Sequence, residues 1–209
     1  MNARQSEIKI PSKNEIERYL KQAKLNSPGP WYEHSLNTAK AAYLIACECE
    51  NMDTDAAYAM GALHDIGRRE GVSQMHHVIA GYDFMTHEGY PDIARICITH
   101  SYITRRVKDD CAKPDCSPDE LLFLQNFIDK TAYNDYDKLI QLCDCICLPD
   151  GFCLLEKRMV DVVLRYGFNE GTLSRWNATF GLKEYFENKI GKSIYSLLPG
   201  VEKTTFGLL

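Results

Sequence analysis

The chain has 209 residues, of which 45% are hydrophobic and 25% are charged, and its formal net charge is −5. This size and composition are typical of a globular protein with one sizeable core, and no second domain is required. The acidic balance argues against a dedicated nucleic-acid-binding protein, which normally presents a basic face. The longest apolar runs are too short to cross a bilayer. We therefore expect a soluble protein with no stable nucleic-acid partner and no membrane association.

Helical spacing of apolar residues recurs along the whole chain. Ser12 followed by Glu15 predicts a capping box at the start of a first helix. The break at Pro28-Gly29-Pro30 precedes a long second helix, and residues 53–65 are so apolar that their short helix should be buried. Further helices are predicted over residues 75–89, 90–101, 119–130, 133–147, 152–167 and 174–190.

The connections between these segments carry little regular pattern. Residues 104–118 are polar and contain prolines, which predicts a surface loop, and residues 149–151 predict a turn. No strand alternation, hairpin signal or internal repeat is evident. The fold class we predict is all-α: a single compact helical domain of roughly nine helices that spans residues 1–209.

Nine cysteines, an odd number, lie mostly inside apolar helical patterns, and no secretory signal precedes them. Reduced thiols in a cytoplasmic protein explain this usage best. The segment LCDCICLPDGFC (142–153) raises the alternative of a zinc site. However, its cysteines alternate between helix faces and lack a second Cys-x-x-Cys pair, so buried thiols are the preferred interpretation.

Ionisable residues stand at the predicted ends of several apolar helices. His64 and Asp65 close the buried short helix, His77 opens the next helix, and His100 ends the one after it. His34 lies in the first turns of the long second helix, and Asp144 interrupts the apolar stretch KLIQLCDCICL. An aspartate buried there is costly unless it is paired or binds a metal.

Imidazole and carboxylate groups together bind divalent ions such as iron, manganese, zinc or cobalt without any thiolate. Adjacent His64 and Asp65 cannot face the same way on a regular helix, but at a helix end both can turn to one centre. We expect Gly67 to let the chain turn away there. Asp65 could also bridge two ions through its two carboxylate oxygens.

The ordered pattern H…HD…H…H…D resembles the HD-domain metal-dependent phosphohydrolase superfamily, over about residues 30–150. The motifs that carry this resemblance are HDIGR, HHVIAG, ITHSY and LCDCI. Its nearest form is that of the bacterial HD-type symmetrical diadenosine tetraphosphate hydrolases. The polar loop over residues 104–118 departs from the shorter glycine-containing segment expected there. Residues 151–209 form a C-terminal helical extension without a readable motif.

The resemblance implies a site of six ligands and two divalent ions. One ion would be held by His34, His64, Asp65 and Asp144, and the other by Asp65, as the bridge, with His77 and His100. A hydroxide between the ions would attack phosphorus, so that His64 and Asp65 form the predicted catalytic centre. The substrate implied is a nucleotide or another small phosphate ester or anhydride, which includes a dinucleoside polyphosphate.

For several residues the sequence alone does not decide the role. His76 could replace His77, although the glycine four residues after His77 favours the latter, whereas His87 lies roughly on the opposite helix face. Arg68, Arg105 and Arg106 are candidates for binding substrate phosphate, against the alternative that they are solvated surface charges.

The alternatives in function also stay open at this point. HEGYP (87–91) lacks the elements that accompany GYP in cyclic-di-GMP phosphodiesterases, and the Glu-Asp pair of alarmone hydrolases is missing after the HD pair. A non-catalytic metal- or nucleotide-binding regulator and a purely structural helical protein remain alternatives to the hydrolase, and a homodimer is left open.

Overall fold

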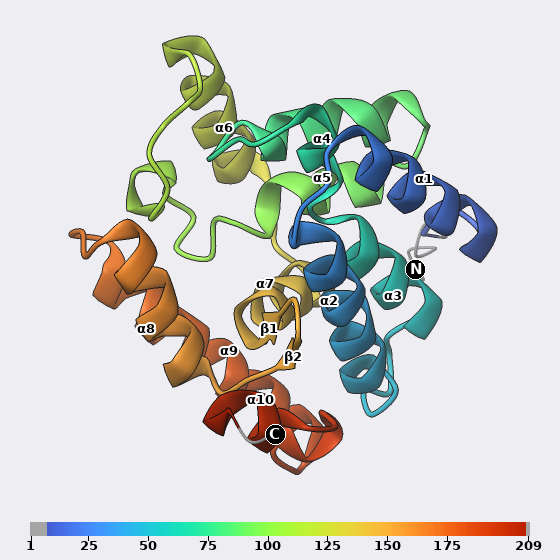
Figure 1. The fold of residues 1–209 in the computed structure, drawn as a ribbon, viewed down its shortest axis with the longest axis vertical. Helices are drawn as coiled ribbons and strands as arrows, with labels where there is room; N and C mark the ends of the chain where they lie inside the picture. Colours follow the sequence, from blue (N-terminus) through green and yellow to red (C-terminus); the bar gives the residue numbers. More distant parts are fainter. Residues whose placement is uncertain (1–7, 208–209) are drawn as a thin grey trace, which may run out of the picture.

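The computed structural model describes residues 8–207, and this part of the chain is all-α (Figure 1). Three short 3₁₀ helices, η1 (Ile66–Glu70), η2 (Val107–Asp109) and η3 (Ile194–Leu197), and two paired two-residue strands, β1 (Cys147–Leu148) and β2 (Gly151–Phe152), connect the α-helices. The α-helices are α1 (Lys13–Asn26), α2 (Trp31–Ala46), α3 (Thr54–Leu63), α4 (His77–His87), α5 (Pro91–Thr99), α6 (Pro118–Lys130), α7 (Asp135–Ile146), α8 (Leu155–Tyr166), α9 (Thr172–Ile190) and α10 (Val201–Phe206).

The predicted helix starts are confirmed by their caps. The Ser12 hydroxyl accepts a hydrogen bond from the Glu15 N–H, and the Glu15 carboxylate accepts one from the Ser12 N–H, so that the capping box of α1 is complete. Ser117 and Glu120 form the same box at the start of α6. Asn134 caps α7 in a third box that the sequence analysis did not anticipate.

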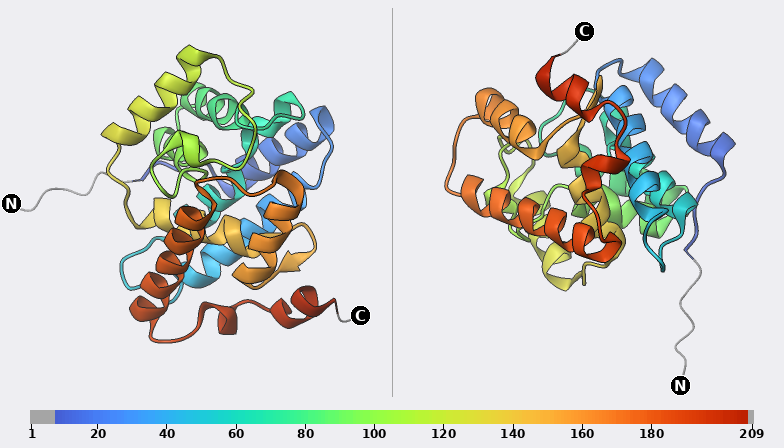
Figure 2. Two further views of the ribbon diagram at one scale, coloured as in Figure 1. Left: turned by 90° about the vertical axis from the view of Figure 1, so that its left-hand side faces the viewer. Right: turned by 90° about the horizontal axis from the view of Figure 1, so that it is seen from below.

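Helix α7 is the centre of the fold. It packs against α2, α3 and α5 on one side and against α8 and α9 on the other. In Figure 1 it lies between the N-terminal helices α1–α3 and the C-terminal helices α8–α10, and Figure 2 shows the same order from two further directions. Its apolar residues Leu139, Ile140, Leu142 and Ile146 are fully buried, because neighbours cover it on nearly every side.

Small residues bring α2 and α3 unusually close together. A Cβ atom on Gly61 would lie only 2.7 Å from the Cα atom of Ala39, so no larger residue fits at this crossing. Ala42 and Ala57 are also fully buried in the same core. The close approach places the C-terminal end of α3 beside the first turns of α2, where two predicted ligands lie.

The structure departs from the sequence prediction in three places. The tenth helix, α10, was not predicted, since six residues are too few to show a periodic pattern. The β1–β2 pair was not predicted either, for the same reason. Third, the prediction of a surface loop over residues 104–118 is wrong in part. Val107 and Asp109 are buried, because Gly171 at the start of α9 packs on Asp109 and Arg175 donates to its carbonyl.

The C-terminal helices pack on the earlier part of the chain. Besides the contacts of α8 and α9 with α7, α10 contacts β2 and η3 contacts α2. The organisation of residues 1–209 as one domain stays a prediction. Within residues 8–207, no helix combines the length and the apolar character that a membrane span requires.

Candidate metal centre

Six side chains from five helices and one helix junction meet beside α7. His34 lies in the first turn of α2, His64 and Asp65 follow the end of α3, and His77 is the first residue of α4. His100 follows the end of α5, and Asp144 lies in the last turn of α7. All but Asp144 are buried, and the Asp144 side chain is 27% exposed, so that solvent reaches the cluster on this side.

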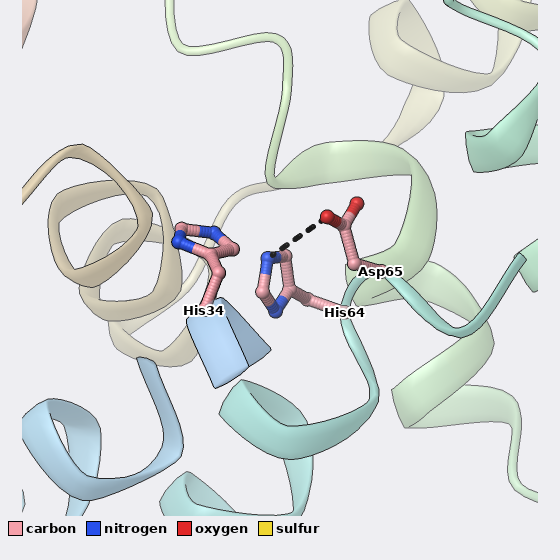
Figure 3. A group of neighbouring side chains, drawn as sticks. All are labelled: His34, His64 and Asp65. Carbon is pink, nitrogen blue, oxygen red and sulfur yellow. Dashed lines mark ion pairs between the residues drawn. The ribbon is translucent and has the colours of Figure 1, made fainter. Parts of the chain in front are cut away.

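The first half of the cluster joins α2, α3 and α7. The Nε2 atom of His34 lies 2.8 Å from Oδ1 of Asp144, and Nε2 of His64 lies 3.8 Å from the same oxygen. His64 Nε2 is also 3.9 Å from Oδ2 of Asp65. Figure 3 shows the His64 ring between His34 and the Asp65 carboxylate. Ligand atoms of His34, His64 and Asp65 lie within 4.8 Å of one another, which suits a single metal ion.

The second half joins η1, α4 and α5 through Asp65. Oδ1 of Asp65 lies 3.1 Å from Nε2 of His77 and 3.7 Å from Nε2 of His100. These three residues also offer ligand atoms that all lie within 4.8 Å of one another. Asp65 is therefore the residue that the two three-residue groups share.

Three imidazoles are oriented by the backbone of their own helical turn. His64 Nδ1 lies 2.7 Å from the Gly61 carbonyl, His77 Nδ1 2.6 Å from the Gln74 carbonyl, and His100 Nδ1 3.1 Å from the Ile96 carbonyl. Because a carbonyl only accepts, each Nδ1 must carry the hydrogen. Each Nε2 then presents a lone pair to the cluster, which is the usual arrangement of a metal-binding histidine.

The unpaired atoms of the cluster fit a cation. His77 Nε2 and Asp65 Oδ1 are both acceptors, yet they lie 3.1 Å apart. Among the described residues, His64 Nε2 and Asp65 Oδ1 are buried without a hydrogen-bond partner. Buried polar atoms are rarely left unsatisfied. Nitrogen and carboxylate oxygen donors that face one another in this way match the ligand preference of borderline-hard divalent ions.

The charge states of the cluster also suit a metal. Burial lowers the pKa of His64 and brings that of His100 to about 3, so that both rings are neutral near pH 7. Burial alone would raise the pKa of Asp65, but the Arg68 guanidinium beside it holds the value well below its usual range. Burial would likewise raise the pKa of Asp144, but the hydrogen bond with His34 and the electrostatic effect of the surrounding histidines together lower it. The cluster thus offers two ionised carboxylates and, in His64 and His100, two neutral imidazoles.

Gly67 positions the second half of the cluster. The expectation that it lets the chain turn away after Asp65 stays a prediction, and its φ does not lie in the left-handed region. A Cβ atom at this position would lie 1.9 Å from the His77 carbonyl oxygen and 2.5 Å from the Gly81 nitrogen. The absent side chain lets η1 touch the first turns of α4, which brings Asp65 to His77.

A buried carboxylate outside the cluster holds the end of α5. Asp137 accepts hydrogen bonds from the Thr99 hydroxyl at 2.7 Å and from Arg95 Nη1 at 2.8 Å. The Gln141 amide donates to the Thr99 carbonyl at 2.7 Å. These contacts from α7 fix the residue immediately before His100. In the sequence, the signal for these contacts is limited to an acidic and an amide residue, Asp137 and Gln141, on one face of an apolar helix.

The three candidate phosphate-binding arginines are placed differently. Arg68 donates from Nε to Asp65 Oδ2 at 2.7 Å and from Nη2 to His77 Nε2 at 3.3 Å, so it lies inside the cluster. Arg105 donates to the carbonyls of Ile128 and Thr131 at the end of α6. Arg106 is half-exposed, 3.8 Å from Asp109. The structure thus brings only Arg68 to the ligands, and the phosphate-binding role of all three stays a prediction.

The two remaining histidines of the chain, His76 and His87, lie outside the cluster. His76 turns away from the cluster and lies 3.4 Å from Glu120, with a half-exposed side chain. His87, at the end of α4, is exposed. Of the two adjacent histidines, His77 is therefore the one that reaches Asp65.

Comparison with protein families matches residues 31–146 to the model of the HD domain. The matched segment is more than half of the chain and runs from the first residue of α2 to the last residue of α7. The chain belongs to the HD domain family. All six cluster residues lie inside the HD domain match, whereas α1 and α8–α10 lie outside it.

HD domain proteins bind divalent metals and are generally metal-dependent phosphohydrolases. The buried histidine and aspartate groups of this chain agree with that property. Searches of curated proteins and of solved structures returned no match to the chain.

Proposed function

We propose that this HD domain protein is a phosphohydrolase that depends on divalent metal ions and acts on a small phosphate ester or anhydride. The observation that carries the proposal is the Asp65 carboxylate, which faces lone pairs of His77 and His100 on one side and lies beside His64 on the other. Arg68 satisfies only Oδ2 of this carboxylate, so the buried Oδ1 faces two acceptors, which is unfavourable unless a cation lies between them.

The proposed ligands divide into two sets that share Asp65. One ion would be held by His34, His64, Asp65 and Asp144, and a second by Asp65, His77 and His100. When bound, divalent ions lower the pKa of water and offset the charge of phosphate oxygens. Iron, manganese, zinc and cobalt are all compatible with nitrogen and carboxylate donors.

The protein's own side chains would orient these ligands. Arg68 holds one oxygen of Asp65, so that the other oxygen is directed at His77 and His100. The carbonyls of Gly61, Gln74 and Ile96 fix the three imidazole rings. Because solvent reaches the Asp144 side chain, we infer that substrate would approach the cluster from this side.

The substrate we favour is a nucleotide, including a dinucleoside polyphosphate, in keeping with the resemblance of the HDIGR and HHVIAG motifs. The cytoplasmic location, the single domain with a metal-site core at about residues 30–150, and a homodimer stay predictions.

Elemental analysis of the purified protein tests the proposal most directly, together with a panel of phosphate esters and anhydrides assayed with added manganese, iron or cobalt. We expect stoichiometric metal and release of phosphate or nucleotide from part of the panel. A protein without stoichiometric metal after reconstitution would refute the proposal. Metal without turnover of any substrate would instead support the alternative of a non-catalytic regulator.

A further inference from the structure

Arg158, in the first turns of α8, is a partly buried cation that the proposed metal centre does not use. Its Nη1 lies 3.1 Å from Oδ2 of Asp161, and its side chain is 18% exposed. Its Nε atom is buried and has no hydrogen-bond acceptor among the described residues. Asp161 is itself 41% exposed and also binds Arg165 at 2.7 Å. This shared, solvated carboxylate satisfies only one edge of the Arg158 guanidinium.

Helix α8, which carries Arg158, packs directly against α7, which carries Asp144 (Figure 1). Burial alone would lower the pKa of Arg158, but, in keeping with this packing, the Asp144 carboxylate contributes most to raising it. The Arg158 guanidinium therefore lies within electrostatic range of Asp144, the one predicted ligand that solvent reaches.

A second residue of α8, Tyr166, also lies towards the cluster. Tyr166 follows Arg158 by two turns of α8 and lies about 80° further around the helix axis. Tyr166 belongs to the surroundings of Arg68, as does Asp144. Two residues of α8 thus lie within electrostatic range of the cluster, Arg158 of Asp144 and Tyr166 of Arg68.

We propose that Arg158 binds a phosphate group of the substrate on the Asp144 side of the metal centre, next to the phosphate group that is hydrolysed. The inference rests on the proposed function and narrows its substrate class to compounds with two or more linked phosphate groups. Arginine offers a planar fork of donors that matches phosphate oxygens, and the unsatisfied Nε–H belongs to this fork.

The test compares Arg158→Gln with Arg165→Gln, because both arginines come from α8 and both bind Asp161. Sodium tripolyphosphate and sodium phosphate are titrated calorimetrically into manganese-loaded protein, with manganese in excess of the added phosphate compound. Manganese content and melting temperature are measured for each variant. A parallel titration uses protein dialysed against a chelator.

We expect Arg158→Gln to weaken the binding of tripolyphosphate by about 10- to 100-fold, the range for a hydrogen bond to a charged group. Orthophosphate binding should change by less than about threefold, and Arg165→Gln should change neither by more than about twofold, since its charge is exposed. Manganese content should equal that of the wild type in both variants.

Equal tripolyphosphate affinity in the two variants would overturn the proposal. An equal loss for orthophosphate would overturn it as well, since the affected phosphate would then be the hydrolysed one. Loss of manganese from Arg158→Gln would mean that Arg158 acts by holding Asp144. If Arg158→Gln does not fold, Arg158→Lys replaces it, and wild-type tripolyphosphate affinity in that variant would be the contrary result.

Failure of the Arg158 proposal can be distinguished from failure of the proposed phosphohydrolase function. If the wild type binds no manganese, the proposed function fails, and the titrations of metal-free protein still compare the two arginines. If the wild type binds manganese and hydrolyses only monoesters, the proposed function holds and the Arg158 proposal fails.

Discussion

Nε2 of His34 lies 2.8 Å from Oδ1 of Asp144, although 110 residues separate them in the chain. One residue belongs to the first turn of α2 and the other to the last turn of α7, so this contact joins the two ends of the segment that matches the HD domain. The cluster is complete only when α7 has docked against α2. Metal binding should therefore be coupled to folding of the whole matched segment.

Substitution of the shared ligand should remove both ions, whereas substitution of a ligand in one half should remove only one. We expect Asp65→Ala to remove both ions, because Asp65 belongs to both groups of ligands. Asp144→Asn and His77→Gln should each remove about half of the bound manganese, with activity reduced at least about 100-fold. Elemental analysis and circular dichroism of the three variants measure metal and fold. Exposed Asp83 on α4 provides the control, Asp83→Ala, which should keep full occupancy. Full manganese in Asp65→Ala would contradict the ligand assignment.

Substitution of Gly67 should be strongly destabilising. A Cβ atom there would lie 1.9 Å from the His77 carbonyl, so Gly67→Ala forces η1 away from α4 and should lower the free energy of unfolding by about 3 kcal/mol. Gly181→Ala is the matched control, because Gly181 lies inside α9 with open space around it. It should be stabilising, by up to about 1 kcal/mol, since alanine is the better helix former. Chemical denaturation measures both, and an equal effect of the two substitutions would refute the argument.

Asp137→Ala should also destabilise the protein, through the support of α5. The change leaves the partly buried Arg95 and the buried Thr99 without their carboxylate partner, which should cost about 3 kcal/mol. Asp92 provides the control, because it lies 3.9 Å from the same Arg95 but is 38% exposed. Asp92→Ala should change the free energy of unfolding by no more than about 0.5 kcal/mol. Denaturant titrations in which the two variants lose similar stability would show that Asp137 is not the support inferred.

The metal-free protein should lose stability as the pH falls below neutrality. The pKa of His100 is about 3 in the folded protein and that of His64 is also lowered, whereas an unfolded histidine titrates near pH 6.5. Between about pH 6.5 and pH 3 the unfolded chain therefore binds protons that the folded chain does not. The free energy of unfolding consequently decreases as the pH is lowered through this range. By pH 5 His100 alone should account for a loss of about 2 kcal/mol.

The carboxylates act in the same direction at lower pH. Because the pKa values of Asp65 and Asp144 are lowered on folding, their contribution to stability is present above about pH 3.8 and is lost as the pH falls further. Thermal melts of chelator-dialysed protein from pH 7.5 to pH 5 test the histidine effect. His100→Gln should flatten the profile, and His87→Gln, at an exposed position, should not. A wild-type melting temperature that does not change over this range would contradict the prediction.

The helices and the ligand cluster could be predicted from the sequence for the same reason. Caps such as Ser12 with Glu15 are local signals, and the cluster residues stand at helix ends, where a polar residue interrupts an apolar pattern. The HD domain order of these residues then indicated which of them should meet, and the structure brings His34 to Asp144 and Asp65 to His77.

The features that could not be predicted are contacts between residues that lie far apart in the chain. Asp137 looks like an ordinary first-turn acid of α7, and only the fold shows that it is buried against Thr99. Arg158 looks like one of several charges on α8, and its unpaired Nε becomes apparent only after α8 packs on α7. For Gly67, glycine in a sequence does not distinguish a turn from a close approach, and the structure shows the latter.

The contacts of His64, His77 and His100 with carbonyls of their own turns separate two properties of the centre. The direction in which each ring points is encoded locally, within three or four residues. The spacing between the rings is encoded globally, by the approach of α2 to α3 at Gly61 and of η1 to α4 at Gly67. Substitutions at these crossings would move the nitrogen atoms apart without rotating the rings. In the proposed metal centre, the ionic radius accepted would thus depend on two positions that do not supply a ligand.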